Sequence, residues 1–411
     1  MSRRPNVAGF LACLLLAPLS SVSGCKSSHT AGSESPQIKW QFSADDRIVS
    51  TPALGQDGTI YFSSPKFLYA LSPDGKLKWR YFAGADLNTS PMVGPDGSIY
   101  IMDMTCVMHA LNPDGSKHWL AQIGPAPLPS SALQPPCWLP ATPAMAASDL
   151  LLVGNSSGSM IGVDPSSGAS LAQFKGVAGP VSPEIPETGT AIEGGGALAL
   201  FDSTGRVAWT LRLSDGRNSV SFRTPAITAE KAIVVAGWDQ KLHAYNPDST
   251  QKWEFPGDWT ANPVIAADGT VYVGGPSDQG LVALSPDGSK LWQSPILVPG
   301  SPALADDGTI YVSGRYAGAV KDSNWFWAMY AVSPKGAIKW RLTVDAPIAN
   351  GPAIAPDGTV YFGTDYSGVT GVDTHSGTLY AIRENNGGLM RGGWPKSYGS
   401  VANDGRAPNA Q

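Results

Sequence analysis

Residues 51–79 read TPALGQDGTIYFSSPKFLYALSPDGKLKW, and this stretch decides the fold. It contains four apolar runs of strand length, labelled A to D in chain order, with an Asp-Gly step between A and B and another between C and D. Asp-Gly between two such runs is a strong hairpin signal, because Gly accepts a positive φ and Asp hydrogen-bonds within its own turn. The stretch therefore predicts one four-stranded antiparallel unit.

This unit recurs along the chain. Each copy starts at a Ser, Thr, Asn or Gly followed by Pro, and the eight starts are Pro52, Pro91, Pro143, Pro183, Pro225, Pro263, Pro302 and Pro352. By subtraction the starts lie 38 to 52 residues apart, a period typical of propeller blades. We predict an all-β fold over residues 37–392, an eight-bladed β-propeller of four-stranded blades.

A Trp closes most copies of the unit, four residues after the second Gly. The resulting Ala-x-x-x-Asp-Gly-x-x-x-Trp pattern resembles the docking motif of the PQQ-type (quinoprotein) β-propeller repeat, over about residues 38 to 383. The resemblance implies that each Trp packs between neighbouring blades. The structural docking residues would be Trp40, Trp79, Trp119, Trp209, Trp253, Trp292 and Trp340. The resemblance implies a fold and leaves the function open, because one fold hosts many functions.

The two chain ends complement each other. Residues 38–42 read as a D strand with no A to C strands before it, whereas the last unit has strand sequences at 360–362 and 379–382 but no Trp-bearing D strand. The N-terminal strand can complete that blade and leave no open edge. An alternative makes 379–382 the D strand, after a C strand at 370–373. Residues 393–411 resemble a C-terminal tail of this family, which implies a segment packed on the ring or disordered.

The first 24 residues read as an export signal. Arg3 and Arg4 supply the positive region, and residues 7–19 form an apolar run that is too short to span a membrane. Small residues follow this run. We therefore expect an exported protein.

Val22-Ser23-Gly24-Cys25 resembles the bacterial lipobox, which implies that Cys25 is lipidated and becomes the mature N-terminus. The alternative is a plain secretory signal with an incidental Cys. Residues 25–36 are then the lipidated Cys and a flexible tether, because they are rich in Ser, Gly and Lys without periodicity. Lys26 stands where Asp commonly signals inner-membrane retention, so the sequence favours the outer membrane.

Charge and motifs argue against several functions. The formal net charge is −5, which gives no electrostatic reason to bind nucleic acid. Catalytic elbows, zinc motifs and phosphate loops are absent from the sequence. His109 and His243 occupy the repeat position held elsewhere by Tyr, so we interpret them as strand residues and not as metal ligands. We predict no enzyme, no metal and no cofactor.

Because the strands alternate in direction, A–B and C–D turns share one face, here the turn face, and B–C and D–A connections share the other, the connection face. The connection face receives the insertions at 121–142, 315–324 and 365–376. Large aromatic side chains and long loops on a rigid scaffold suit a binding surface, although loop cores can also bury such residues. The partner-binding candidates are Trp138, Trp238, Trp259, Arg315, Tyr316, Trp325, Trp327 and Tyr366.

A lipobox before an eight-bladed ring resembles the β-propeller lipoproteins of the outer-membrane β-barrel assembly machinery, which present a propeller face to a partner protein. The leading hypothesis is therefore a non-catalytic, monomeric scaffold that binds a protein partner at the cell envelope. One alternative is a PQQ-dependent dehydrogenase, although enzymes of that kind usually carry an adjacent Cys-Cys disulfide that this chain lacks. A glycan-binding surface module is a further alternative.

Two cysteines lie outside the N-terminal segment. Cys106 falls in the B–C connection of the second blade, and Cys137 falls in the long D–A connection that leaves the same blade. Both connections emerge on one face, so we predict a disulfide in the exported protein. The alternative is two free buried thiols.

Overall fold

The structure is a computed structural model. It describes residues 36–403 with gaps at 124–141, 146–149, 155–158, 176–180, 186–188, 195–196, 202–206, 214–223, 277–278, 317–326, 345, 349, 366–375, 393–394 and 401. The chain divides into two compact units, 1–33 and 34–411, and every described residue belongs to the second. In the described residues all regular structure is β-strand, and no helix there is long and apolar enough to cross a membrane.

The strands of the second unit form eight antiparallel sheets, numbered here in chain order. Sheet 1 contains β2 (Ala53–Leu54), β3 (Ile60–Ser63), β4 (Phe67–Leu71) and β5 (Leu77–Phe82). Sheet 2 contains β6 (Met92–Val93), β7 (Ile99–Met102), β8 (Val107–Leu111) and β9 (Lys117–Gln122). Sheet 3 contains β10 (Ala144–Met145), β11 (Leu151–Gly154), β12 (Ser159–Val163) and β13 (Ser170–Lys175). Sheet 4 contains β14 (Val181–Ile185), β15 (Gly189–Gly194), β16 (Ala197–Phe201) and β17 (Val207–Arg212).

The remaining sheets follow the same order, with one extra strand in sheet 7. Sheet 5 contains β18 (Ala226–Ile227), β19 (Ile233–Ala236), β20 (Lys241–Tyr245) and β21 (Gln251–Pro256). Sheet 6 contains β22 (Val264–Ile265), β23 (Val271–Gly274), β24 (Leu281–Leu284) and β25 (Lys290–Ser294). Sheet 7 contains β26 (Ile296–Leu297), β27 (Ala303–Leu304), β28 (Ile310–Tyr316), β29 (Trp327–Val332) and β30 (Ile338–Val344). Sheet 8 contains β31 (Ala353–Ile354), β32 (Val360–Gly363), β33 (Thr378–Arg383) and β1 (Gln37–Ser43).

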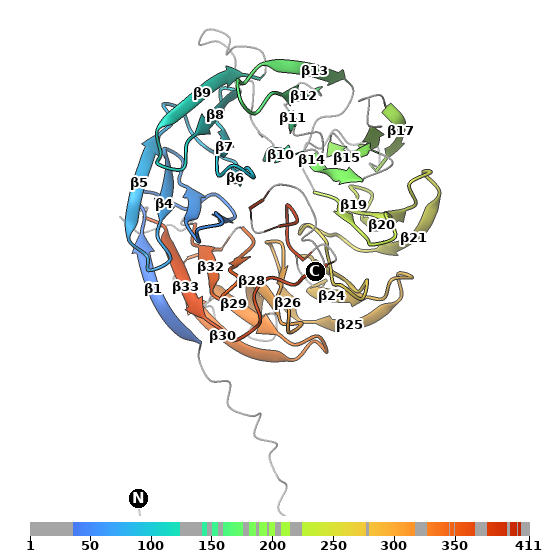
Figure 1. Ribbon diagram of the computed structural model, residues 1–411. Coiled ribbons are helices and arrows are strands. Elements are labelled where there is room, and N and C mark those ends of the chain that lie inside the picture. Colours follow the sequence, from blue (N-terminus) through green and yellow to red (C-terminus); the bar gives the residue numbers. More distant parts are fainter. Residues whose placement is uncertain are drawn as a thin grey trace, which may run out of the picture. The chain divides into compact units, whose positions relative to one another are not determined.

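Each sheet is buried in its middle and exposed at its last strand. All four residues of β3 are buried, whereas β5 alternates between exposed and half-buried residues. Figure 1 shows the first strands β6, β10 and β14 on the inner side of the unit and the last strands β5, β9 and β13 on its outer side. The all-β prediction with four-stranded antiparallel units is confirmed.

The Asp-Gly turns have the local chemistry that their sequence predicts. Gly58 has φ +77°, and the Asp57 carboxylate accepts hydrogen bonds from the backbone N–H and the hydroxyl of Thr59, at 3.0 and 2.7 Å. The second Gly of the unit also serves the neighbouring sheet. A Cβ on Gly75, which has φ +84°, would lie 2.6 Å from the Trp40 ring.

Six of the seven docking Trp residues bridge adjacent sheets. Each indole N–H donates a hydrogen bond of 2.8 to 3.0 Å to a Pro carbonyl in the next sheet, in the pairs Trp40–Pro73, Trp79–Pro113, Trp119–Pro165, Trp209–Pro247, Trp253–Pro286 and Trp292–Pro334. For Trp340 the residue at the Pro position is Glu384, and this junction lacks the indole hydrogen bond of the others. Burial raises the pKa of Glu384.

The N-terminal strand belongs to the last sheet. β1 pairs antiparallel with β33, in a register that sets Trp40 opposite Ala381, as Trp79 lies opposite Ala70 in sheet 1. β33 pairs on its other side with β32, so it is not the outermost strand. The alternative with residues 379–382 as a D strand is therefore wrong.

The tail after β33 packs along inner strands. The backbone N–H groups of Asp306, Leu304 and Val93 donate to the carbonyls of Gly388, Pro395 and Ala402, at 2.8 to 2.9 Å. The tail therefore runs antiparallel to β27, passing first the C-terminal end of this strand and then its N-terminal end. The Asn403 side chain then donates to the carbonyls of Thr51 and Pro91, at 3.2 and 3.0 Å. Figure 1 shows this segment, in red, in the middle of the second unit.

Candidate binding face

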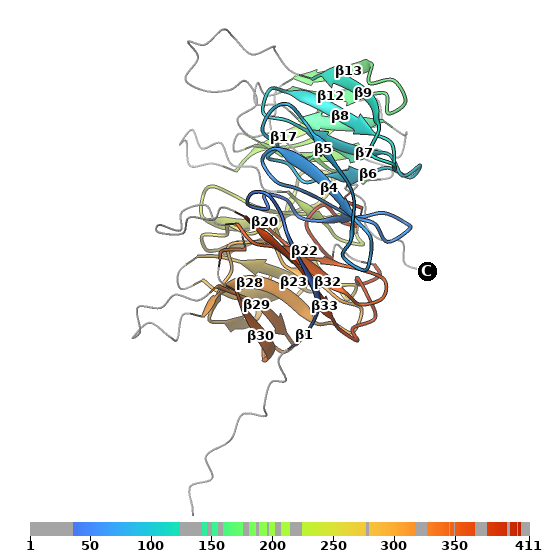
Figure 2. The same ribbon diagram turned by 90° about the vertical axis from the view of Figure 1, so that its left-hand side faces the viewer.

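Eight residues of the connection face are partner-binding candidates. The structure describes the side chains of four of them. Trp138, Trp325 and Tyr366 lie outside the described residues, and Tyr316 is described only as the last residue of β28. Figure 2 shows the second unit from the side. The insertions lie largely in the gaps at 124–141, 317–326 and 366–375.

Two of the predicted insertions begin later than expected. Ala121 and Gln122 continue β9, and Arg315 and Tyr316 continue β28. The pairing of β28 with β29 ends at Gly314, opposite Ala328, and the end of β28 pairs with β26 instead, with Leu297 opposite Arg315. Residue 315 therefore lies on a paired strand and not in a loop.

Arg315 and Trp327 form a cation–π pair at this end of sheet 7. The guanidinium carbon of Arg315 lies 4.4 Å from the centre of the Trp327 ring, and both residues are half-buried. Each comes from a paired strand, so the two side chains are held together without a partner present. Arg and Trp are the residue types that most often carry binding energy at protein interfaces.

Trp259 was a partner-binding candidate, and this prediction is wrong. Its side chain is completely buried, with an indole N–H to Phe255 carbonyl distance of 3.4 Å and its ring 5.7 Å from the Phe255 ring. A side chain enclosed in this way offers no surface to another molecule. Trp238 is half-buried beside Asp239 in the B–C connection of sheet 5 and stays a candidate.

His109 and His243 lie in β8 and β20, each beside a carboxylate. The Nε2 atom of His109 lies 3.0 Å from Asp103, and that of His243 lies 3.0 Å from Asp239. Burial alone would raise the pKa of Asp103. Hydrogen bonds from His109, from Thr105 and from a backbone N–H outweigh this effect and lower the pKa. No cluster of three or more His, Cys, Asp or Glu suited to a metal ion occurs in the described residues.

Cys106 is buried and disulfide-bonded, and its φ is +65°. It is the only cysteine among the described residues, so its partner lies outside them. The alternative in which Cys106 is a free thiol is therefore wrong. The pairing of Cys106 with Cys137 stays a prediction.

A chain of hydrogen bonds joins the sheets at their inner side. At four described junctions the residue before the first Pro of a sheet uses its side-chain oxygen to accept the backbone N–H of its counterpart in the preceding sheet. The bonds are Thr51 to Ser90 (3.0 Å), Ser90 to Thr142 (3.3 Å), Thr224 to Asn262 (2.9 Å) and Asn262 to Ser301 (3.1 Å). Gly351, at this position in sheet 8, has no side chain to offer.

A cavity of about 160 Å³, here called the inner cavity, lies where this chain is interrupted. Its described lining is uncharged and consists of Thr51, Thr260, Asn262, Pro299, Gly300, Ser301, Asn350, Gly351, Ser397 and Tyr398. Most of these residues precede the first strands of sheets 1, 6, 7 and 8, and the last two come from the tail. Sequence reasoning missed this site, because it treated the Ser/Thr/Asn-Pro steps only as markers of the repeat.

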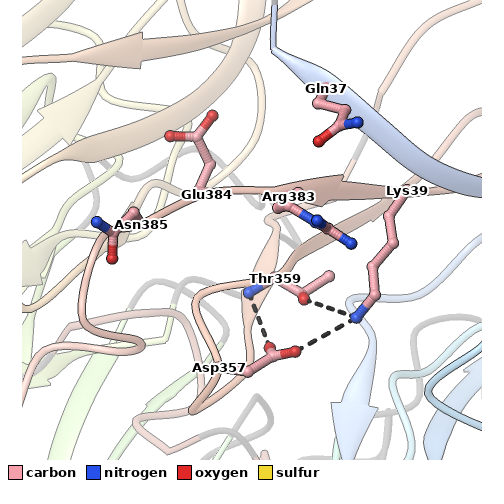
Figure 3. Close-up of a pocket in the computed structure, with 7 residues that line it drawn as sticks. All are labelled: Gln37, Lys39, Asp357, Thr359, Arg383, Glu384 and Asn385. Atoms are coloured by element: carbon pink, nitrogen blue, oxygen red, sulfur yellow. Dashed lines mark hydrogen bonds and ion pairs between the residues drawn. The ribbon is translucent and has the colours of Figure 1, made fainter.

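A second cavity, the seam pocket of about 520 Å³, lies where β1 joins sheet 8. It is lined by Gln37, Lys39, Asp357, Thr359, Arg383, Glu384 and Asn385. Figure 3 shows the Lys39 amine between Asp357 and Thr359, at 3.3 Å from each.

The same lysine contact recurs in other sheets. Lys78 Nζ lies 3.1 Å from Asp57 and 2.8 Å from Thr59, and Lys339 binds Asp307 and Thr309 in the same way. The ion pair of Lys39 is therefore part of the repeat and not a feature of the seam pocket alone.

Comparisons with known proteins point to one family. A family model described as outer membrane protein assembly factor BamB matches residues 33–182 and 177–324. The structure is similar to BamB from Moraxella catarrhalis, with a TM-score of 0.64 and 17% identity, over 84% of this chain and 99% of that one.

Two other solved structures share the fold. A europium-containing methanol dehydrogenase gives a TM-score of 0.62 at 12% identity, over 85% of this chain and 93% of that one. The C-terminal WD40 domain of Sif2 gives 0.62 at 13% identity, over 86% and 100%. No curated protein matches the sequence. The resemblance to the PQQ-type β-propeller repeat is confirmed.

Proposed function

Because the chain belongs to the family described as outer membrane protein assembly factor BamB, we propose that it is a non-catalytic β-propeller scaffold of the cell envelope that binds a protein partner. The eight sheets are then the blades of one closed propeller, in which β1 completes the last. The Arg315–Trp327 pair is the observation that carries the proposal of partner binding. Its two strands hold an aromatic and a cationic group in a fixed arrangement, so little side-chain entropy is lost when a partner binds.

The alternative function is a PQQ-dependent dehydrogenase, and the inner cavity and the seam pocket do not fit PQQ. PQQ carries carboxylates, which need cationic or metal partners when buried. The inner cavity has no charged residue in its described lining and is smaller than the roughly 300 to 1,000 Å³ of a drug-sized site. In the seam pocket the cations Lys39 and Arg383 are accompanied by the carboxylates Asp357 and Glu384.

Partner binding is tested by Trp327→Ala. We expect capture of the partner from the protein's own membranes to fall at least about tenfold, because removing an aromatic anchor costs about 2 kcal/mol or more at an interface hot spot. Capture is measured by quantitative mass spectrometry after mild detergent extraction.

The matched control is Leu291→Ala, which removes an exposed apolar side chain from the outer strand β25. Capture should be unchanged by this substitution. If both variants capture the same proteins as the wild type, partner binding through the Arg315–Trp327 pair is wrong.

We further propose that Cys25 carries the lipid that holds the protein at the outer membrane. Cys25→Ala removes the thiol on which the anchor depends, so the variant should move from the membrane fraction to the soluble fraction. Fractionation followed by immunoblotting measures the change, and Cys106→Ala serves as the control that keeps the anchor. A Cys25→Ala variant that stays with the membrane contradicts the lipoprotein proposal.

A further inference from the structure

We propose that the inner cavity binds one uncharged sugar ring. This inference is independent of the protein partner, because the cavity is lined by the inner ends of four sheets and by the tail, and not by Arg315 or Trp327. Four observations carry it: a break in the inner hydrogen-bond chain, a floor built by the tail, a small volume and an uncharged lining.

The break lies at Gly351. At four other junctions a Ser, Thr or Asn oxygen lies between two sheets and accepts a backbone N–H. A Cβ on Gly351 would lie 2.8 Å from the Ser301 carbonyl oxygen, so the chain runs too close there for a side chain. The inner cavity lies beside this junction, where polar groups of neighbouring sheets converge.

The tail gives this space a floor. The buried Lys396 ammonium binds the Ser400 carbonyl, at 3.2 Å, and also binds Asn403 Oδ1, while Asn262 Nδ2 donates to the Ser397 hydroxyl at 2.8 Å. These contacts fix the turn that presents Ser397 and Tyr398 to the cavity. Tyr398 has φ +63°, a left-handed conformation that a bulky residue adopts only when its surroundings impose it.

The volume limits the ligand. A cavity of about 160 Å³ is smaller than the roughly 300 to 1,000 Å³ of a drug-sized site, so its ligand is small, such as a single sugar ring. Larger molecules would have to leave most of their surface outside. The cavity therefore fits one ring, either a free monosaccharide or the terminal unit of a glycan.

The lining selects against charge. Hydroxyls, carboxamides and backbone groups supply both donors and acceptors, which suits the hydroxyls of a neutral sugar. A carboxylate or an ammonium in the same place would find no counter-ion among the described lining residues, and an unpaired charge is costly to bury.

Sugars that share one ring and differ in charge test the inference. Saturation-transfer NMR on the intact exported chain compares glucose, galactose and N-acetylglucosamine with cationic glucosamine and anionic glucuronate. We expect a Kd on the order of 1 mM for at least one neutral sugar, because a ligand of this size can gain only limited affinity. Both charged sugars should bind at least about tenfold more weakly than that neutral sugar.

Two variants test whether the sugar that shows saturation transfer binds in the inner cavity. Asn350→Asp adds a carboxylate to a half-buried lining residue without changing its shape, so it should strengthen glucosamine binding at least about tenfold and weaken glucuronate binding. Tyr398→Asn changes a lining residue but keeps one that tolerates φ +63°, so it should weaken binding of the neutral sugar. Circular dichroism of both variants checks the fold.

Trp327→Ala is the matched control, because it lowers partner capture under the proposed function and should leave sugar binding unchanged. The inference is overturned if no neutral sugar shows saturation transfer, if charged and neutral sugars bind alike, or if Asn350→Asp leaves their ranking unchanged. Loss of partner capture together with retained sugar binding, or the reverse, shows which of the two proposals fails.

Discussion

Trp119→Ala is expected to lower the free energy of unfolding by about 3 to 5 kcal/mol, the usual cost of deleting a buried Trp side chain. The Trp119 side chain is 9% exposed, its ring centre lies 5.9 Å from that of Tyr100, and its indole N–H donates to the Pro165 carbonyl at 2.9 Å. Alanine leaves a void between sheets 2 and 3 and removes the donor to Pro165. Urea unfolding followed by Trp fluorescence measures the change.

Trp119→Phe separates the two contributions, because it keeps a ring between the sheets and removes only the indole N–H. Its cost should be about 1 to 3 kcal/mol, the range for a single lost hydrogen bond and the buried acceptor it leaves. If Trp119→Ala and Trp119→Phe are equally stable, the packing of the ring is not what joins the sheets.

Gly115→Ala is expected to cost about 2 to 5 kcal/mol, for two additive reasons. Gly115 has φ +84°, and the left-handed conformation costs an L-residue about 1 to 2 kcal/mol. The new Cβ would also lie 2.5 Å from the Trp79 ring, so the indole that bridges sheets 1 and 2 must move. Displacing a packed side chain costs about 1 to 3 kcal/mol more.

Gly84→Ala is the matched control, because Gly84 has φ +87° and no atom within 4 Å of its Cβ position. This substitution carries the backbone cost alone. The difference between the two variants, measured by the same denaturation, reports the steric displacement of Trp79. Equal costs for Gly84→Ala and Gly115→Ala contradict the packing of that indole on the glycine.

The repeat could be predicted from the sequence because its signals are local. An Asp-Gly step determines its own turn, and a Trp four residues later lies at a constant place on the following strand. The pairing of residues 37–43 with the last sheet followed from the same logic, since each end of the chain lacked what the other supplied. These features require no knowledge of distant contacts.

The binding candidates could not be predicted equally well. The sequence shows that Trp259 lies in a connection, but its burial against Phe255 depends on how the chain folds back locally. The inner cavity depends on the path of the tail, whose residues Ser397 and Tyr398 come into contact with sheets that are distant in sequence. No local pattern in residues 395–403 specifies that path.

The bridge between neighbouring sheets has a consequence for how such a protein can grow. Six junctions join an indole on one sheet to a proline carbonyl on the next, so they are made by unlike surfaces in a head-to-tail order. A tandem gene duplication of one unit would therefore bring a matching donor and acceptor with it. The number of units can change during evolution without the invention of a new interface, provided that the first and last strands of the chain can still meet.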